Sequence, residues 1–76
     1  MALAYVLISS ETGVEAELLN ELKRVDGVKQ VYVVYGVYDL IAKVEGKSMD
    51  ELKETISRHI RGLDHLNSTL TLLVVD

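Results

Sequence analysis

The chain alternates between apolar runs and amphipathic stretches. Residues 2–9, 28–35, 39–45 and 66–75 are rich in Val, Ile, Leu and Tyr, a composition typical of β-strands. In the two longer intervals between them, apolar residues recur at spacings of three and four, which predicts helices that each bury one side. The predicted order is therefore strand, helix, strand, strand, helix, strand.

Each predicted helix begins with a capping-box pattern, in which Ser or Thr precedes Glu by three residues. Thr12 with Glu15 marks the first start, and Ser48 with Glu51 marks the second. The apolar stripe of the first helix consists of Val14, Leu18, Leu22 and Val25. That of the second consists of Met49, Leu52, Ile56, Ile60 and Leu63.

The second and third strands are close enough in sequence to pair as an antiparallel hairpin, with Gly36 at the turn. Each half of the chain is then a strand–helix–strand unit. Two such units with right-handed crossovers give the ferredoxin-like α+β fold, βαββαβ, a four-stranded antiparallel sheet with both helices on one face. Residues 1–76 are predicted to form this single domain.

The second face of that sheet is also predicted to be apolar. In the first strand Leu3, Tyr5 and Leu7 alternate with other apolar residues, and only the third strand is half polar, through Lys43 and Glu45. Covering five or six such side chains, at about 1.5 kcal/mol each, would rival the stability expected of the domain. A face-to-face homodimer is therefore predicted. The alternatives are a monomer with an exposed apolar face and a domain that packs against another protein's sheet.

Composition narrows the function. The absence of Cys excludes disulfides and thiolate metal sites, and His59 and His65 match no common ligand spacing, so neither a metal nor a cofactor is expected. A net charge of −4 without a basic run argues against direct nucleic-acid binding. No stretch is long and apolar enough for a membrane span and no leader is apparent, so a cytoplasmic location is expected.

Three segments resemble the effector-binding domain of the Lrp/AsnC family of amino-acid-responsive regulators. Residues 33–40, with the pattern Gly36-Val37-Tyr38-Asp39, resemble the family's Gly-x-aromatic-Asp hairpin. Residues 25–31 resemble the approach to its second strand, and residues 67–71 resemble its fourth strand, where Thr-x-Thr is usual. The resemblance covers essentially the whole chain. It departs from the family at residues 62–66, where a Pro-Gly-Val-like turn is usual and this chain has no proline.

The resemblance implies a dimer with facing sheets, often assembled further into rings of eight or ten subunits, and an amino-acid effector bound near the hairpin between dimers. Full-length members carry an N-terminal helix-turn-helix domain, whereas this chain starts with the first strand. It thus resembles the free-standing effector domains. The expected partners are further copies, an amino acid and full-length Lrp/AsnC regulators, without direct contact to nucleic acid.

A free amino acid presents an ammonium and a carboxylate, which need a protein anion and N–H or hydroxyl donors respectively. Asp39 offers the anion, Tyr38 a ring and hydroxyl, and Gly36 a close approach to backbone. If the fourth strand lies near the hairpin, it adds hydroxyl donors from Ser68, Thr69 and Thr71. Each residue also has a purely structural interpretation: a turn glycine, a packing tyrosine, a turn-capping aspartate and threonines with high strand propensity.

The leading hypothesis is therefore an amino-acid-binding regulatory domain that self-assembles and modulates Lrp/AsnC regulators. No catalytic residues are expected, because no Ser-His-acid order, cysteine nucleophile or metal cluster stands out. The alternative is a small dimeric αβ-barrel enzyme of the monooxygenase or isomerase kind, although such enzymes usually place His, Trp or Asn in the barrel. A purely structural assembly subunit is a third possibility.

Overall fold

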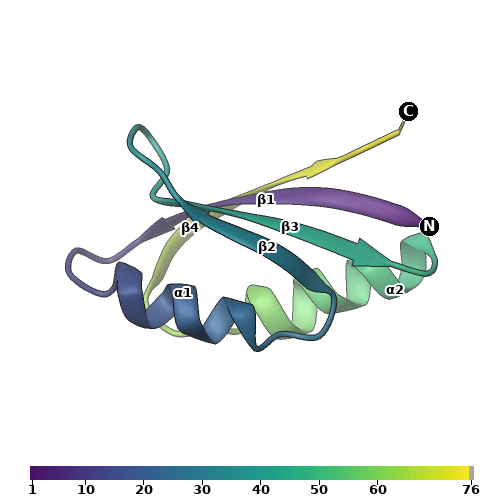
Figure 1. Cartoon of the computed structure of the whole chain (residues 1–76), viewed down its shortest axis with the longest axis horizontal. Helices are drawn as coiled ribbons and strands as arrows, with labels where there is room; N and C mark the ends of the chain where they lie inside the picture. The colour runs from purple at the N-terminus through teal and green to yellow at the C-terminus, as the bar shows by residue number, and fades with distance from the viewer. Residues whose placement is uncertain (76) are drawn as a thin grey trace.

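The computed structural model describes residues 1–75 and confirms the predicted order of elements. The elements are β1 (Ala2–Ser10), α1 (Glu15–Lys23), β2 (Val28–Val33), β3 (Leu40–Gly46), α2 (Met49–Glu54), the π-helical turn η1 (Thr55–Ile60) and β4 (Leu66–Leu73). The strands lie in the order β2-β3-β1-β4, and every neighbouring pair is antiparallel. Both helical segments lie on one face of this sheet (Figure 1), as in the ferredoxin-like fold.

The core lies between the sheet and the helices. Alternate residues of β1 and β3 point toward the helices and are fully buried, which is the period-two pattern of strands. The two predicted helix stripes meet them. The buried apolar residues are Ala4, Val6, Ile8, Leu18, Leu22, Leu40, Ala42, Val44, Leu52, Ile56 and Ile60. Val14, Val25, Met49 and Leu63 are only partly buried, at the margins of the core.

One of the two predicted helix caps is confirmed and the other is wrong. The Ser48 hydroxyl accepts a hydrogen bond from the Glu51 N–H at 3.1 Å. Thr12, by contrast, does not cap α1, whose N-cap is Val14 with no side-chain hydrogen bond. The reason is Gly13, which adopts a positive φ of 88° and turns the chain before the helix begins. The Glu15 carboxylate accepts the Gly13 N–H at 3.2 Å instead.

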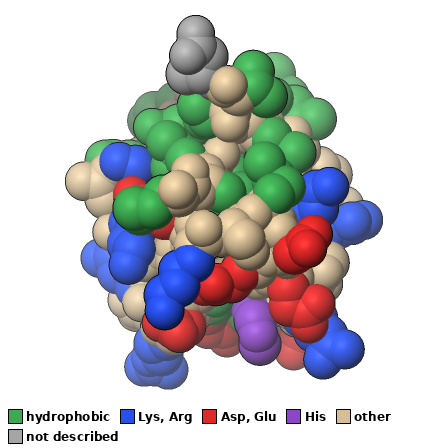
Figure 2. All heavy atoms as spheres, turned by 90° about the vertical axis from the view of Figure 1, so that its right-hand side faces the viewer, with side chains coloured by type: hydrophobic (Ala, Val, Ile, Leu, Met, Phe, Trp, Pro, Cys, Tyr) green, Lys and Arg blue, Asp and Glu red, His purple; other side chains and the backbone are tan. Residues whose placement is uncertain are grey.

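The second face of the sheet is apolar, as predicted, and nothing in residues 1–75 covers it. Cross-strand pairs on this face include Leu7 with Leu70 and Tyr5 with Leu72. Leu70 and Leu72 are 45% and 50% exposed. Hydrophobic side chains gather on the sheet side of the molecule, whereas charged ones gather on the helix side (Figure 2). We call this surface the open face. Its polar part lies on β2 and β3, where Lys43 contacts Glu45 at 3.9 Å.

Gly27 combines a left-handed backbone conformation with close neighbours. Its φ is +99°, and an added Cβ would lie 3.1 Å from the Glu45 carbonyl oxygen and 3.4 Å from Thr55 Cγ2. Gly13 has a similar φ of +88° but nothing within 4 Å, so it is the matched control. Gly13→Ala should lower the free energy of unfolding by about 1 kcal/mol through backbone strain alone, and Gly27→Ala by about 2–3 kcal/mol. Equal losses in urea denaturation would contradict this account.

Candidate functional site

The β2–β3 hairpin carries the residues singled out from the sequence. β2 ends at Val33, two residues before the predicted end, and the following loop leaves the sheet. Its tip is exposed, including Tyr35 and Val37, and Gly36 adopts a positive φ of 141°. Figure 1 shows this loop rising out of the sheet on the side away from the helices. The loop closes where the Val34 N–H donates to the Asp39 carbonyl at 2.9 Å.

Asp39 joins the hairpin to the end of β1. Its backbone N–H donates to the Ile8 carbonyl at 2.8 Å, and its Oδ2 atom accepts the Ser10 N–H at 2.9 Å. The β1–β4 register shifts between Ser9 and Ser10, so the Ser10 N–H falls outside the regular hydrogen-bond ladder that pairs the preceding residues. The carboxylate therefore has a structural role.

Ser10 is the residue at this site that sequence reasoning missed. Its carbonyl accepts a hydrogen bond from the Asn67 side-chain amide at 3.1 Å. The residue is only 7% exposed, and its hydroxyl is the one fully buried side-chain polar atom in residues 1–75 without a hydrogen-bond partner. A serine at the end of an apolar strand gives no signal of this kind, because the burial of its hydroxyl depends on segments that are distant in the sequence.

A cavity of about 350 Å³ opens beside Asp39. Its lining combines two carboxylates with apolar side chains: Glu15, Val33, Val34, Tyr35 and Asp39. Glu15 comes from the first turn of α1, and the sequence pattern predicts for it a capping role rather than a place in this cavity. Gly36 and Tyr38 do not line this cavity, although they belong to the same loop, and Tyr38 is half-buried. Two carboxylates beside an apolar wall can hold an ammonium group that carries an apolar substituent.

The candidate hydroxyls of β4 do not join this cavity within one chain. β1 lies between β4 and β3, so β4 is two strand spacings, about 9–10 Å, from β3. Ser68 pairs with Ser9, and Thr69 pairs with Ile8 near the hairpin end. Thr71 pairs with Val6, farther along β1. Thr69 and Thr71 lie on the helix-covered face, whereas Ser68 lies on the open face.

The turn before β4, where the sequence departs from the family pattern, uses a left-handed residue in place of a proline. His65 has a φ of +71°, and its carbonyl accepts the Glu11 N–H at 2.9 Å. Its Nδ1 atom lies 3.4 Å from Glu11 Oε1. Residues 1–75 contain no group of three or more His, Asp or Glu placed to hold a metal ion. No helix in that range is long and apolar enough to cross a membrane.

A ferredoxin-like sheet with one uncovered apolar face and a cavity at its hairpin end defines a small ligand-binding domain. The particular family follows from comparison with known proteins. The family model described as "Lrp/AsnC ligand binding domain" matches residues 3–76. The chain therefore belongs to the Lrp/AsnC ligand binding domain family, which confirms the resemblance drawn from the hairpin.

Solved structures agree with this assignment. FFRP-DM1 superimposes with a TM-score of 0.93 at 36% identity, covering 99% of this chain and 100% of that chain. A hypothetical protein from Pyrococcus horikoshii gives 0.92 at 36% identity, covering 99% and 90%. Escherichia coli AsnC gives 0.89 at 26% identity, covering 99% of this chain but 51% of AsnC.

Curated relatives are much longer than this chain. A homocitrate synthase from Sulfurisphaera tokodaii is 36% identical over 73 residues, which are 95% of this chain and 16% of the enzyme. One from Saccharolobus solfataricus is 41% identical over 56 residues, which are 74% of this chain and 12% of the enzyme. The chain therefore spans only a small part of the enzymes that it resembles.

The structural role of Asp39 can be separated from any ligand role. Asp39→Ala removes the acceptor of the Ser10 N–H and should lower the free energy of unfolding by about 1–3 kcal/mol. Asp39→Asn keeps an oxygen acceptor in the same place and should lower it by less than about 1 kcal/mol. Urea denaturation of both variants without ligand measures the difference. An Asn variant as unstable as the Ala variant would show that the negative charge, rather than the hydrogen bond, holds β1.

Proposed function

We propose that this domain is an amino-acid-binding regulatory module, which self-assembles through its open face and modulates Lrp/AsnC transcription regulators in the cytoplasm. The observation that carries the proposal is the family match over residues 3–76, together with a cavity at the hairpin that holds two carboxylates. A ligand regulates such a module only by binding one state of assembly more tightly than another.

The cavity suggests how an amino acid would bind. Its ammonium would contact Asp39 and Glu15, which line the same cavity, and its side chain would lie against Val33 and Tyr35. Its carboxylate would accept hydrogen bonds from backbone N–H groups of the loop around Gly36, where the positive φ of a glycine lets the ligand approach the backbone closely. A regulator from Neisseria meningitidis, solved as a complex with L-Met, shares this fold at a TM-score of 0.84, but at 10% identity it supports the architecture only.

A neighbouring subunit would complete the site. Tyr35 and Val37 extend from the hairpin with little contact to their own chain, so another copy can cover them. In a ring of dimers, an octamer or decamer, the hydroxyls of Ser68, Thr69 and Thr71 would have to come from a second subunit to reach the ligand. Full-length Lrp/AsnC regulators could supply that subunit equally well, because they share the same domain.

A second candidate function is regulation of a metabolic enzyme rather than of transcription. The similarity to a small part of homocitrate synthases favours it, because that part could dock on this chain as a full-length regulator would. In both cases we assign the domain no reaction of its own. The residues that line the hairpin cavity include two carboxylates and a tyrosine, but none of them is the histidine usual in small αβ-barrel enzymes.

Amino-acid binding is tested with a calorimetric and thermal-shift panel of the twenty amino acids at millimolar concentration. At least one should bind, and Asp39→Asn should weaken it about tenfold or more, because a charge-assisted contact to the ammonium is lost. Asp50→Asn, at an exposed position in the first turn of α2 near the other end of the sheet, is the matched control and should bind normally. Absence of any response across the panel would overturn the proposed ligand class.

Self-assembly is tested by sedimentation equilibrium at several concentrations. The wild-type chain should be at least a dimer at tens of micromolar, and Leu72→Glu should be a monomer because it buries a charge in the open face. Val37→Glu places the same charge on the exposed hairpin tip, outside the four strands, and should still form dimers while losing larger rings. A monomeric wild-type chain, or a dimeric Leu72→Glu variant, would contradict the role of the open face.

A further inference from the structure

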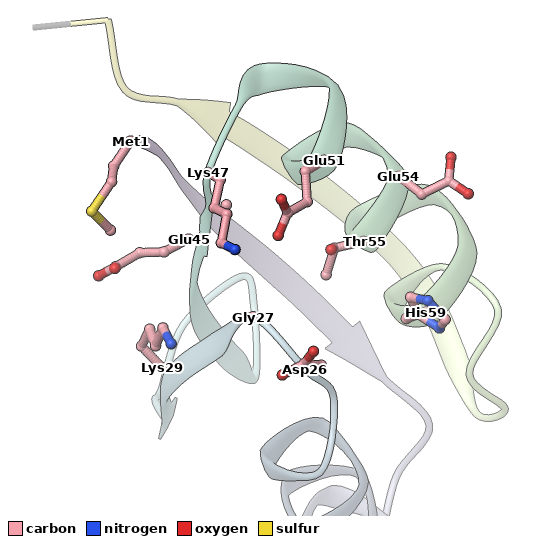
Figure 3. A pocket seen from close by; sticks show the side chains of 11 residues that line it. Met1, Asp26, Gly27, Lys29, Glu45, Lys47, Glu51, Glu54, Thr55 and His59 are labelled. Carbon is pink, nitrogen blue, oxygen red and sulfur yellow. The ribbon is translucent and has the colours of Figure 1, made fainter.

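A larger cavity lies at the opposite end of the sheet from the hairpin. It has a volume of about 610 Å³, within the range of small-molecule sites. Four segments line it: residue 1, the start of β2 with the turn before it, the end of β3 with the turn after it, and the helical segment α2–η1. Figure 3 shows Lys47, Glu51 and Thr55 on the helical side, with Asp26 and Lys29 on the facing side. Gly27 forms the floor, where a side chain would collide with the Glu45 carbonyl.

Charged groups of both signs line this cavity. Two of its four carboxylates are engaged elsewhere, because Glu45 contacts Lys43 at 3.9 Å and Glu54 contacts Arg58 Nε at 2.7 Å. In Figure 3 the Glu54 side chain points away from the cavity. Met1, which carries the amino terminus, also lines the cavity. The charged side chains that remain are two carboxylates and two ammonium groups: Asp26 and Lys29, Glu51 and Lys47. Within residues 1–75, none of these four forms an ion pair within 4.0 Å.

Thr55 gives an independent indication of a ligand. It lines the cavity although the residue is only 8% exposed, and its hydroxyl takes part in none of the side-chain hydrogen bonds found in residues 1–75. Its hydroxyl oxygen would lie 3.7 Å from a Cβ placed on Gly27, so the side chain is directed at the cavity floor. Thr55 also begins η1, where the Arg61 N–H bonds to the Ile56 carbonyl five residues earlier. Such π-turns are rare and occur frequently at functional sites.

From this arrangement we propose a second ligand site, which binds a small organic zwitterion with one ammonium and one carboxylate. The ligand ammonium contacts Glu51 and Asp26, the carboxylate contacts Lys47 and Lys29, and the Thr55 hydroxyl completes the set. A metal ion does not fit, because no three acidic or histidine side chains in the described part of the chain converge on one point. The site is separate from the hairpin cavity and does not rest on the function proposed above.

The test is a two-dimensional amide NMR titration of the whole chain with a series of ω-amino acids, from glycine to 5-aminopentanoate, at millimolar concentration. At least one should shift the amide signals of Gly27, Gly46 and Thr55. Butylammonium and butyrate, which carry one charge each, should not. Glu51→Gln, Lys47→Gln and Thr55→Val should each raise the Kd about tenfold, the loss of one hydrogen bond to a charged group.

Lys53→Gln is the control, since Lys53 lies on α2 outside the cavity. Asp39→Asn should leave the shifts of these three amides unchanged. If the hairpin proposal fails, only the amide signals of residues 34–40 should stay unshifted. The second site is overturned if no zwitterion shifts the three amides, if butylammonium or butyrate shifts them equally, or if the cavity variants titrate like Lys53→Gln.

Discussion

One constraint governs this molecule: two helical segments can cover only one face of a four-stranded sheet. β1 shows the consequence most clearly. Val6 and Ile8 are fully buried beneath the helices, whereas Tyr5 and Leu7 between them face outward. No element of residues 1–75 lies over that surface, so covering it requires contacts from outside this domain. The exposure of the open face and the proposed assembly through it both follow from this constraint.

The features that could be predicted from the sequence are those that depend on neighbouring residues. Periodicity located both helices and all four strands, and the Ser48 cap formed because its partner Glu51 is three residues away. The same pattern at Thr12 failed because the intervening Gly13 took a left-handed conformation, a choice that the pattern does not determine. The hairpin also leaves the sheet earlier than its apolar residues suggested, because Tyr35 and Val37 have no strand to pack against in a single chain.

The candidate sites were less predictable, because each joins residues that are distant in sequence. Gly36, Tyr38 and Asp39 were found through a family pattern, but that pattern could not show that Asp39 holds the Ser10 N–H. Glu15 reaches the hairpin cavity only because α1 begins there. Likewise, the cavity around Thr55 includes a π-turn that the spacing of residues did not predict. The two cavities lie at opposite ends of the sheet, and the open face runs between them, so either ligand could bias how two copies meet.

The central claim is that a second copy covers the open face. The most direct measurement is an isotope-filtered NOE experiment on an equimolar mixture of ¹³C-labelled and unlabelled chains, which detects only contacts between copies. We expect intermolecular NOEs from the methyl groups of Leu70 and Leu72 to Tyr5 and Leu7 of the other copy, since these residues share that face. Intermolecular NOEs confined to the hairpin tip, or none from Leu70 and Leu72, would contradict the account.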